Sequence, residues 1–527
     1  MFLKTSRSLF GALSGALLAM AAAAPGCGAK SGLRAPDGGP EDAGADRFVP
    51  RDCTIDADCT TDDLCAPQVC REGKCAPADP VNCDDGDECT EDSCDPPTGK
   101  CSSRELARDE DGDGHRGPRP GFKPGAPGAC GDDCDDTSAK AFPGGVEICD
   151  GVDNDCNGIV DDDMRYVPAG QQEILVSAGP HRQAGRGGLV WNQNVYGVTY
   201  TGEQANWRNY FKGLGRTGTT DIPETPITNV AGTTFTGPIV WTGAMFGTTW
   251  EDRRTAQNYE VWFNRLDAKG NKLGPDVRLS DAPGFSLHPA LVWNGSEFLV
   301  AWDDTRESSR RIFGQRIDAD GKPLGENQIL TLSAWNAESP SLVEGERTLG
   351  MAFNMGPAMG QQVAMRLYGP DFGTPSDLIT LDTDSAVGPV VVFSRDRYVI
   401  AWEKKNVVPG DAIWGATVSE DGTIIVPARR LTSGSQFART AALLSLGDRV
   451  LLVWSQYVSG NYELFSKMLT TGLEDLSAGE RITQSGGESI GPLAAFGPEG
   501  DIGVLFSDTK SGNWQVYFSR LICTAGR

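Results

Sequence analysis

An aromatic residue closes an apolar run of residues seven times along the last two-thirds of this 527-residue chain. The gaps between successive members of the series are 50, 52, 51, 49, 52 and 52 residues. The seven marker aromatics are Tyr200, Trp250, Trp302, Phe353, Trp402, Trp454 and Phe506. A constant period of this length indicates a repeat architecture, in which each unit buries its apolar face against its neighbours.

Each repeat consists of short strand-like segments separated by turn residues. Around Trp302, apolar residues at 289–293 precede an Asn-Gly turn, residues 298–302 carry the marker aromatic, and 312–317 and 328–330 follow. Four strands in about 50 residues are typical of a β-propeller blade. The repeats therefore predict an all-β, seven-bladed β-propeller over residues 165–527. The alternative is a pair of β-sandwich domains with coincidental spacing.

The two ends of the repeat region predict how the ring closes. Residues 173–176 resemble a fourth strand but precede the first full repeat, whereas the last repeat ends with its third strand at 516–521. We expect the first strand to complete the seventh blade, which removes two exposed sheet edges. Cys523 would then lie near the join, where it could pair with an otherwise odd cysteine upstream.

The sequence Trp-Asp-Asp-x-Arg at 302–306, varied as Trp-Glu-Asp-Arg-Arg at 250–254, resembles a signature of bacterial lipoprotein propellers. Asp303 and Asp304 could be proposed as the acid and base of a glycosidase. However, acidic residues recur at the same place in other repeats, as in Glu251-Asp252, and residues that repeat by blade usually have a structural role. We therefore expect no catalytic residues and no enzyme. The alternative is a carbohydrate-active propeller enzyme, a glycosidase or lyase.

The N-terminus is typical of an export signal. Lys4 and Arg7 precede an apolar stretch, and residues 1–26 end directly before Cys27. A cysteine at this place resembles the lipidation site of bacterial lipoproteins, whose acylated cysteine anchors the protein to a membrane. The alternative is plain secretion after cleavage near Ala24. Residues 27–51 are rich in Gly, Ala, Pro and Asp and predict a flexible tether.

Residues 52–104 form a cysteine-rich module with almost no large apolar side chains, so we expect disulfides to hold it. Its second half, 83–101, resembles the short CTDC repeats of slime-mould extracellular matrix proteins. Nine cysteines lie here, so one must pair outside the module or stay free. The disulfide candidates of the whole chain are Cys53, Cys59, Cys65, Cys70, Cys75, Cys83, Cys89, Cys94, Cys101, Cys130, Cys134, Cys149, Cys156 and Cys523.

Negative charge is concentrated before the repeats. Residues 41–163 contain 33 Asp and Glu against 11 Lys and Arg, which accounts for most of the net charge of −25. Such a segment favours cations as partners and argues against nucleic acid. Within residues 105–164, two runs place oxygen-bearing side chains at alternate positions followed by Gly, as a calcium-binding loop requires. The candidate metal ligands are Asp109, Asp111, Asp113, Asp132, Asp133, Asp135, Asp136, Asp150, Asp153, Asp155, Asn157 and Asp161.

Both loops lack the Glu that completes a helix-loop-helix site, since Pro120 and Met164 stand there. Each ion must therefore borrow ligands from a neighbouring loop, for instance Asp135, Asp136 or Glu147. The run from 109 to 158 resembles the metal-binding motif of MopE-type bacterial surface proteins and the thrombospondin type 3 calcium repeats. The MopE resemblance suggests copper, but copper prefers His or Met ligands and only His115 is near. We expect more than one structural Ca²⁺ ion.

These features together predict an exported, calcium-binding surface protein with a lipid anchor as its only membrane contact. We expect it at the cell surface or outer membrane, or otherwise secreted or periplasmic. Its ring would bind an extracellular glycan or surface protein.

Overall fold

The computed structural model describes residues 52–525, with gaps at 163, 171–172, 178, 180–181, 204–206, 231, 255–257, 308, 332–335, 358–359, 409 and 434–436. The expected signal peptide, the expected lipidation residue Cys27 and the expected tether lie outside the described residues. In the described part of the chain, we find no helix with the length and apolarity that a membrane crossing demands.

The chain divides into two compact units. A cysteine-rich unit contains the residues up to Asp85 together with Asp92–Ser103. A ring unit contains Gly86–Glu91 and the chain from Arg104 onward, so the acidic segment and the repeats belong to one unit.

Disulfides replace an apolar core in the cysteine-rich unit. Its buried cluster consists of three cysteines, and its four bridges are Cys53–Cys70, Cys59–Cys75, Cys65–Cys94 and Cys83–Cys101. The elements of this region are the 3₁₀ turn η1 (Asp56–Asp58) and two hairpins, β1 (Gln68–Arg71) with β2 (Lys74–Pro77) and β3 (Thr90–Asp95) with β4 (Lys100–Glu105). The ninth cysteine, Cys89, pairs outside the expected module with Cys130.

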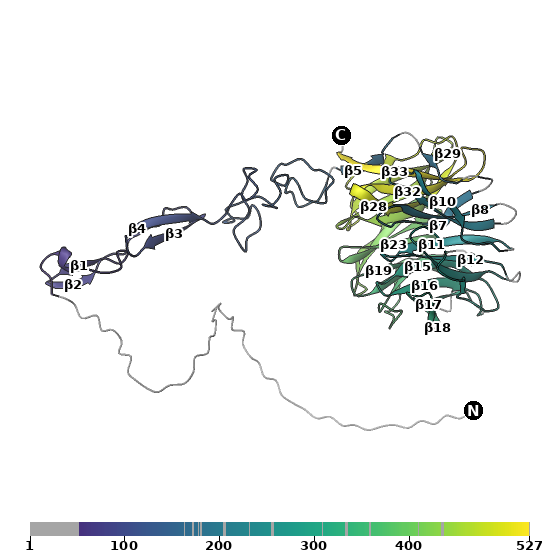
Figure 1. Cartoon of the computed structure of the whole chain (residues 1–527), viewed down its shortest axis with the longest axis horizontal. Helices are drawn as coiled ribbons and strands as arrows, with labels where there is room; N and C mark the ends of the chain where they lie inside the picture. Colours follow the sequence, from purple (N-terminus) through teal and green to yellow (C-terminus); the bar gives the residue numbers. More distant parts are fainter. Residues whose placement is uncertain are drawn as a thin grey trace, which may run out of the picture. The chain divides into compact units, whose positions relative to one another are not determined.

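The repeat region is a seven-bladed β-propeller, as the spacing predicts (Figure 1). Six blades are four-stranded antiparallel sheets. In chain order, blade one contains β7 (Arg182–Trp191), β8 (Tyr196–Glu203), β9 (Trp207–Leu214) and β10 (Thr220–Pro226); blade two contains β11 (Thr234–Trp241), β12 (Phe246–Asp252), β13 (Glu260–Leu266) and β14 (Val277–Arg278); blade three contains β15 (Ser286–Trp293), β16 (Glu297–Asp304), β17 (Arg311–Asp318) and β18 (Pro323–Ile329). Blade four contains β19 (Ala337–Glu344), β20 (Leu349–Met355), β21 (Gln362–Tyr368) and β22 (Ile379–Asp382); blade five contains β23 (Ala386–Ser394), β24 (Arg397–Lys404), β25 (Ala412–Ser419) and β26 (Ile424–Arg430); blade six contains β27 (Ala438–Ser445), β28 (Arg449–Val458), β29 (Asn461–Thr470) and β30 (Glu480–Arg481).

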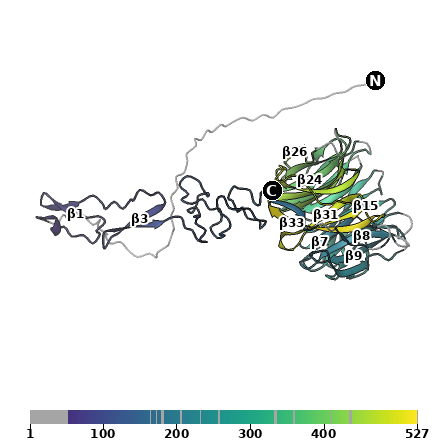
Figure 2. The same ribbon diagram turned by 90° about the horizontal axis from the view of Figure 1, so that it is seen from above.

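The seventh blade closes the ring with strands from both ends of the repeat region. It contains β31 (Ser489–Phe496), β32 (Ile502–Asp508) and β33 (Gln515–Ala525), with the 3₁₀ turn η2 (Pro498–Gly500) between the first two. Its outer strand is built from β5 (Met164–Pro168) and β6 (Ile174–Leu175), which both pair with β33. The sequence predicts only the second of these two pieces. Figure 1 shows β5 beside β33, and Figure 2 shows β31 and β33 next to β7 of the first blade.

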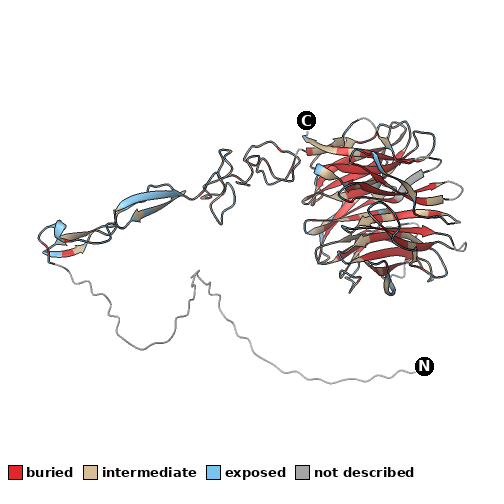
Figure 3. Cartoon of the chain, in the orientation of Figure 1, coloured by how far each residue is buried: buried red, intermediate tan, exposed pale blue. Residues whose placement is uncertain are grey.

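The marker aromatics form the centre of each blade. Each lies on its blade's second strand, and all seven are at most 4% exposed. Figure 3 shows burial concentrated in the strands of the ring. The first strands of successive blades lie side by side, from β7 round to β31 and back to β7. The ring therefore has one buried layer between each pair of blades.

Candidate metal centre

The first acidic loop is held in a tight turn by its own carboxylates. Asp109 accepts hydrogen bonds from the backbone N–H groups of Gly112 (2.7 Å) and Gly114 (3.1 Å). Both glycines have positive φ angles, 84° and 99°, a conformation that residues with a Cβ seldom adopt. Asp111 and Asp113 each accept the N–H of the residue two positions on. Both oxygens of Asp109 thus shape the loop, whereas Asp111 and Asp113 each use Oδ1 and keep Oδ2 without a hydrogen-bond partner.

Two carboxylates from a neighbouring loop complete this cluster, as the missing twelfth ligand predicts. Carboxylate oxygens of Asp111, Asp113 and Asp133 lie within 4.8 Å of one another, and so do oxygens of Asp109, Asp111 and Asp136. Asp136 also accepts the N–H of Glu110 at 2.8 Å. Asp111 belongs to both groups and therefore lies at the centre of the cluster.

Three oxygens in this cluster are buried without a hydrogen-bond partner: Oδ2 of Asp111, of Asp113 and of Asp133. Asp133 itself is fully buried. Its pKa is raised above the ordinary value, first by burial and then by the nearby charges of Asp113, Asp111 and Asp136. Buried, mutually repelling carboxylates are costly unless a cation lies between them. The residues present therefore fit a metal ion.

The second loop, 153–162, has the same internal bonding. Asp153 accepts the N–H groups of Asn157 (3.2 Å) and Gly158 (2.8 Å), and Asp155 accepts that of Asn157 at 3.1 Å. Asn157 also donates its side-chain N–H to Asp162 at 3.1 Å.

Glu147 is the borrowed carboxylate of the second loop. It is 8% exposed, and its Oε1 accepts the N–H of Asp155 at 2.9 Å, whereas its Oε2 is buried without a hydrogen-bond partner. Burial first, and then the charges of Asp155 and Asp162, raise the pKa of Glu147. The sequence predicts Glu147 as a borrowed ligand, whereas it misses Asp162, which occupies no regular loop position.

Asp161 has a different role from the one its spacing suggests. Its side chain is buried, accepts the N–H groups of Asp150 and Gly151 at 3.1 Å, and pairs with Arg449 of β28. The backbone carbonyl of Asp161 accepts a second bond from Arg449 at 2.9 Å. Asp161 therefore joins the acidic segment to the ring.

The remaining candidates lie at the edge of the clusters. Asp132 is half exposed and lies 3.4 Å from His115, whose ring stacks on Phe142 at 5.1 Å. Asp135 accepts the hydroxyl of Thr137 at 2.6 Å, and the exposed Asp150 accepts the N–H of Val152 at 3.1 Å.

Two further disulfides fix the acidic segment. Cys134 pairs with Cys156, which links the loop of Asp133 and Asp136 to the second loop, and Cys149 pairs with Cys523 of β33. Cys523 was expected to take the odd cysteine of the module, but that cysteine bonds with Cys130 instead. All fourteen described cysteines are in disulfides, so none is available as a thiolate ligand.

The acidic pairs of the ring have structural roles. Asp304 is 1% exposed and accepts bonds from the Trp302 indole N–H (3.0 Å) and from Arg306 (2.6 Å). Asp252 does the same with Trp250 and Arg254. Asp303 is fully buried and bonds with His288 at 2.6 Å. Neither Asp303 nor Asp304 can reach a substrate as an acid or base.

The residue after the marker aromatic connects neighbouring blades. Every first strand has a register shift against its second strand. At this bulge, a backbone N–H of the first strand donates a hydrogen bond to the side chain that follows the marker aromatic in the preceding blade. The bonds that show it are Thr236 to Thr201 (2.8 Å), His288 to Glu251 (2.6 Å), Ser339 to Asp303 (3.1 Å) and Gly388 to Asn354 (2.9 Å). The repeated polar residue is thus an inter-blade connection.

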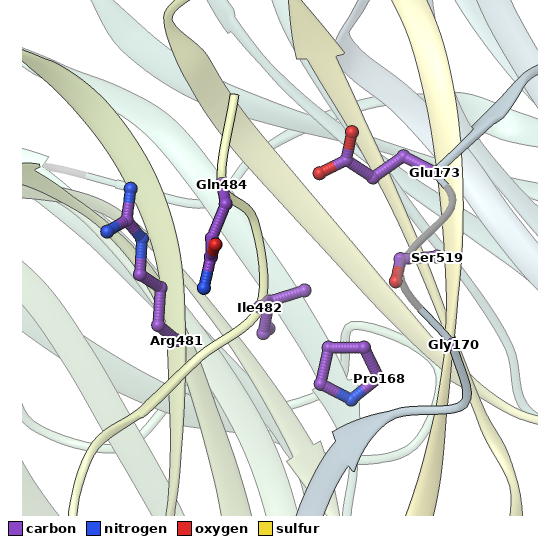
Figure 4. A pocket seen from close by; sticks show the side chains of 7 residues that line it. All are labelled: Pro168, Gly170, Glu173, Arg481, Ile482, Gln484 and Ser519. Carbon is purple, nitrogen blue, oxygen red and sulfur yellow. The ribbon is translucent and has the colours of Figure 1, made fainter. Parts of the chain in front are cut away.

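The ring has two polar cavities of about 540 Å³ each. The first lies where the segment between β5 and β6 faces β30, and its charged lining residues are Glu173 and Arg481 (Figure 4). Glu173 pairs with Lys510, and Arg481 with Glu463 at 2.9 Å. The second cavity lies between the loops of blades three and four and contains Arg310 and Glu338.

One family model matches the chain, over residues 133–162: Cu-binding MopE, described as a "Putative metal-binding motif". It covers the second loop with Asp133 and Glu147, and leaves the first loop outside. Among curated proteins, none matches the sequence.

Solved structures resemble the chain in fold at low identity. A polysaccharide lyase of family PL25, an ulvan lyase, is 8% identical, with a TM-score of 0.45 over 67% of this chain and 95% of its own. The β-propeller domain of the Trilobed protease from Pyrococcus furiosus is 9% identical, with a TM-score of 0.41 over 66% and 95%. The α-L-arabinofuranosidase from Lactobacillus brevis is 10% identical, with a TM-score of 0.31 over 45% and 90%.

The expectation that the chain is not an enzyme is corrected by this comparison. The solved structures similar to the ring include arabinofuranosidases and a polysaccharide lyase. The inaccessibility of Asp303 and Asp304 excludes those two residues alone.

Proposed function

We propose that this chain is an exported calcium-binding protein in which the acidic segment is joined to a ligand-binding propeller. The cations bind at the two loops, and the ring binds an extracellular glycan or protein. The charge of the acidic segment and the seven disulfides support an oxidising compartment outside the cytoplasm. Cys27 would be acylated and anchor the chain, a proposal that the intact mass of the exported protein tests directly.

The observation that carries the proposal is the group of three buried, unpartnered oxygens on Asp111, Asp113 and Asp133. Calcium accepts six to eight oxygen ligands in flexible geometry, which suits carboxylates gathered from two loops. Copper and zinc prefer imidazole, thioether or thiolate ligands. The described residues offer one imidazole near the first loop, that of His115, and no free thiolate.

The test is calcium titration of the EDTA-treated chain by calorimetry, with Cu²⁺ titrated in parallel. We expect Ca²⁺ dissociation constants on the order of 10⁻⁴–10⁻³ M, as in other extracellular modules. Asp133→Asn should weaken binding at the first loop at least tenfold, because it removes a buried charged ligand. Asp132→Asn is the matched control, since that neighbouring side chain is half exposed and outside the cluster.

Three results would count against the calcium assignment. The first is no heat of Ca²⁺ binding at millimolar ion. The second is equal weakening by the Asp132 and Asp133 variants. The third is Cu²⁺ binding that Asp133→Asn weakens while leaving Ca²⁺ binding unchanged, which would favour copper as the ion of this site.

A further inference from the structure

The ring has two faces with different roles. The acidic segment attaches on the face where β28 begins at Arg449 and β33 ends, near Cys523. The opposite face, here called the open face, consists of the loops from second to third strands and from each blade to the next. The bonds described above between the acidic segment and the ring, from Asp161 to Arg449 and from Cys149 to Cys523, lie on the first of these faces.

Four aromatic side chains cross the open face from blade one to blade three. They form a row, here called the aromatic strip, with the members Trp207, Phe235, Tyr259 and Phe285. Successive ring centroids are 6.2, 5.9 and 6.4 Å apart, with interplanar angles of 41°, 35° and 40°. Phe285 is 45% exposed, and the other three are partly exposed. Each lies at or next to the start of a first or third strand, beside the open-face loops.

The aromatic strip ends at a polar cavity. Phe285 donates its backbone N–H to the Thr305 hydroxyl at 2.7 Å and accepts the Thr305 N–H at 3.0 Å. Thr305 lines the cavity of about 540 Å³ that also contains Arg310, Glu338 and Gln361. Glu338 pairs with both Arg310 and Gln361. The polar cavity therefore begins at the residue that is hydrogen-bonded to Phe285, the last member of the aromatic strip.

We propose that the aromatic strip and this cavity bind an uncharged polysaccharide chain. The C–H faces of sugar rings carry slight positive charge and stack on the negative faces of aromatic rings. A row of rings at regular spacing can hold successive sugar residues, and the cavity offers amide, hydroxyl and charged groups for sugar hydroxyls. Within the cavity, Arg310 is paired with Glu338 and its guanidinium lies 3.6 Å from Asp303. Along the strip, the Arg253 guanidinium lies over the Tyr259 ring at 5.4 Å, and the anionic comparison tests whether this cation favours a polyanion. This inference rests on the proposed ligand binding by the ring and is independent of the cation sites.

The experiment is binding of the full chain to soluble xylan, β-glucan, galactomannan and arabinan, measured by affinity electrophoresis and calorimetry. Polygalacturonate serves as the anionic comparison. We expect at least one neutral polysaccharide to bind, and Phe285→Ala and Tyr259→Ala each to weaken binding at least tenfold. Phe496→Ala is the matched control, because Phe496 is similarly exposed (41%) but ends β31 on the opposite face. Thermal unfolding checks that every variant is folded.

Four outcomes would overturn the inference. These are no binding of any neutral polysaccharide, tighter binding of polygalacturonate, an equal loss in the Phe496 variant, and a Phe285 variant that loses thermal stability but keeps its binding. If no neutral polysaccharide binds while Ca²⁺ still binds, the glycan site fails and the cation part of the proposed function stands. Release of reducing ends during the assay would support the site and show that bound glycan is cleaved.

Discussion

Removing the Cys149–Cys523 disulfide should destabilise the ring more than removing any bridge of the cysteine-rich unit. This bond joins residues 374 positions apart, and the loop it closes contains the whole propeller. Loop-closure entropy in the unfolded chain gives a stabilisation of about 6 kcal/mol for such a loop, against about 3 kcal/mol for the 17-residue separation of Cys53–Cys70. Native disulfides typically contribute about 2–5 kcal/mol, so we expect a loss between about 2 and 6 kcal/mol.

The assay is urea unfolding of the Cys149→Ser/Cys523→Ser double variant, followed by tryptophan fluorescence. All twelve tryptophans lie between Trp191 and Trp514, so this signal reports the ring alone. Coincident transitions by circular dichroism would justify a two-state free energy. The control is the Cys53→Ser/Cys70→Ser double variant, whose bridge lies in the other unit.

The reasoning is refuted if the ring of the Cys149/Cys523 variant unfolds at the same urea concentration as the wild-type ring. It is also refuted if the control variant shifts the tryptophan transition by as much. The first result would show that the pairing of β5 and β6 with β33 closes the ring without help from the covalent bond.

Two further predictions concern the connections between blades. Asn354 is 2% exposed and bonds with Ala386 and Gly388 of the next blade, so Asn354→Ala should cost about 1–3 kcal/mol by leaving buried groups unpaired; the exposed turn residue Asn271→Ala is the control, and equal urea midpoints would contradict the role. Glu403 has a raised pKa, because burial outweighs the lowering effects of Lys405 and the Thr440 N–H. The contribution of Glu403 to folding stability is therefore fully present while its carboxyl is protonated, and this contribution is lost as pH rises through its folded pKa. Glu403→Gln keeps a hydrogen-bond acceptor, so it should raise the melting temperature at pH 8 with a gain that disappears in acid; a gain independent of pH would contradict this.

The ring could be predicted from sequence because each blade repeats the same local pattern. The marker aromatics fall on second strands, and residues 312–317 fall within β17, since alternation and turn residues act over short distances. The outer strands are harder to predict from sequence, because they pair on one side only and are as short as two residues in β14 and β30. The piece β5 has no repeat to identify it, as it lies beside β33 only once the ring is closed.

The candidate site was predicted less completely, and the reasons are geometric. The first loop and its borrowed Asp133 and Asp136 follow from local spacing and from the charge that must be neutralised. Asp161 has a regular loop position, yet its carboxylate faces Arg449, which is 288 residues away in the chain. The aromatic strip does follow the repeat, since Trp207 and Tyr259 are 52 residues apart and Phe235 and Phe285 are 50 apart. These positions lie at or next to strand starts outside the apolar runs, so the series of marker aromatics does not include them.

The acidic segment joins the ring at the blade that closes it. This position determines how a mechanical force (a load) applied to the chain before the acidic segment reaches the propeller. Such a load arrives at Cys149 before it arrives at β5 and passes to β33 through the disulfide. Without the bond it would act on the edge strand and separate β5 from β33 one hydrogen bond at a time. Arg449 lies in the sixth blade and holds Asp161, and Arg165 of β5 pairs with Glu480 of that blade at 2.7 Å. The acidic segment and β5 are thus bound to the sixth blade as well as to the seventh.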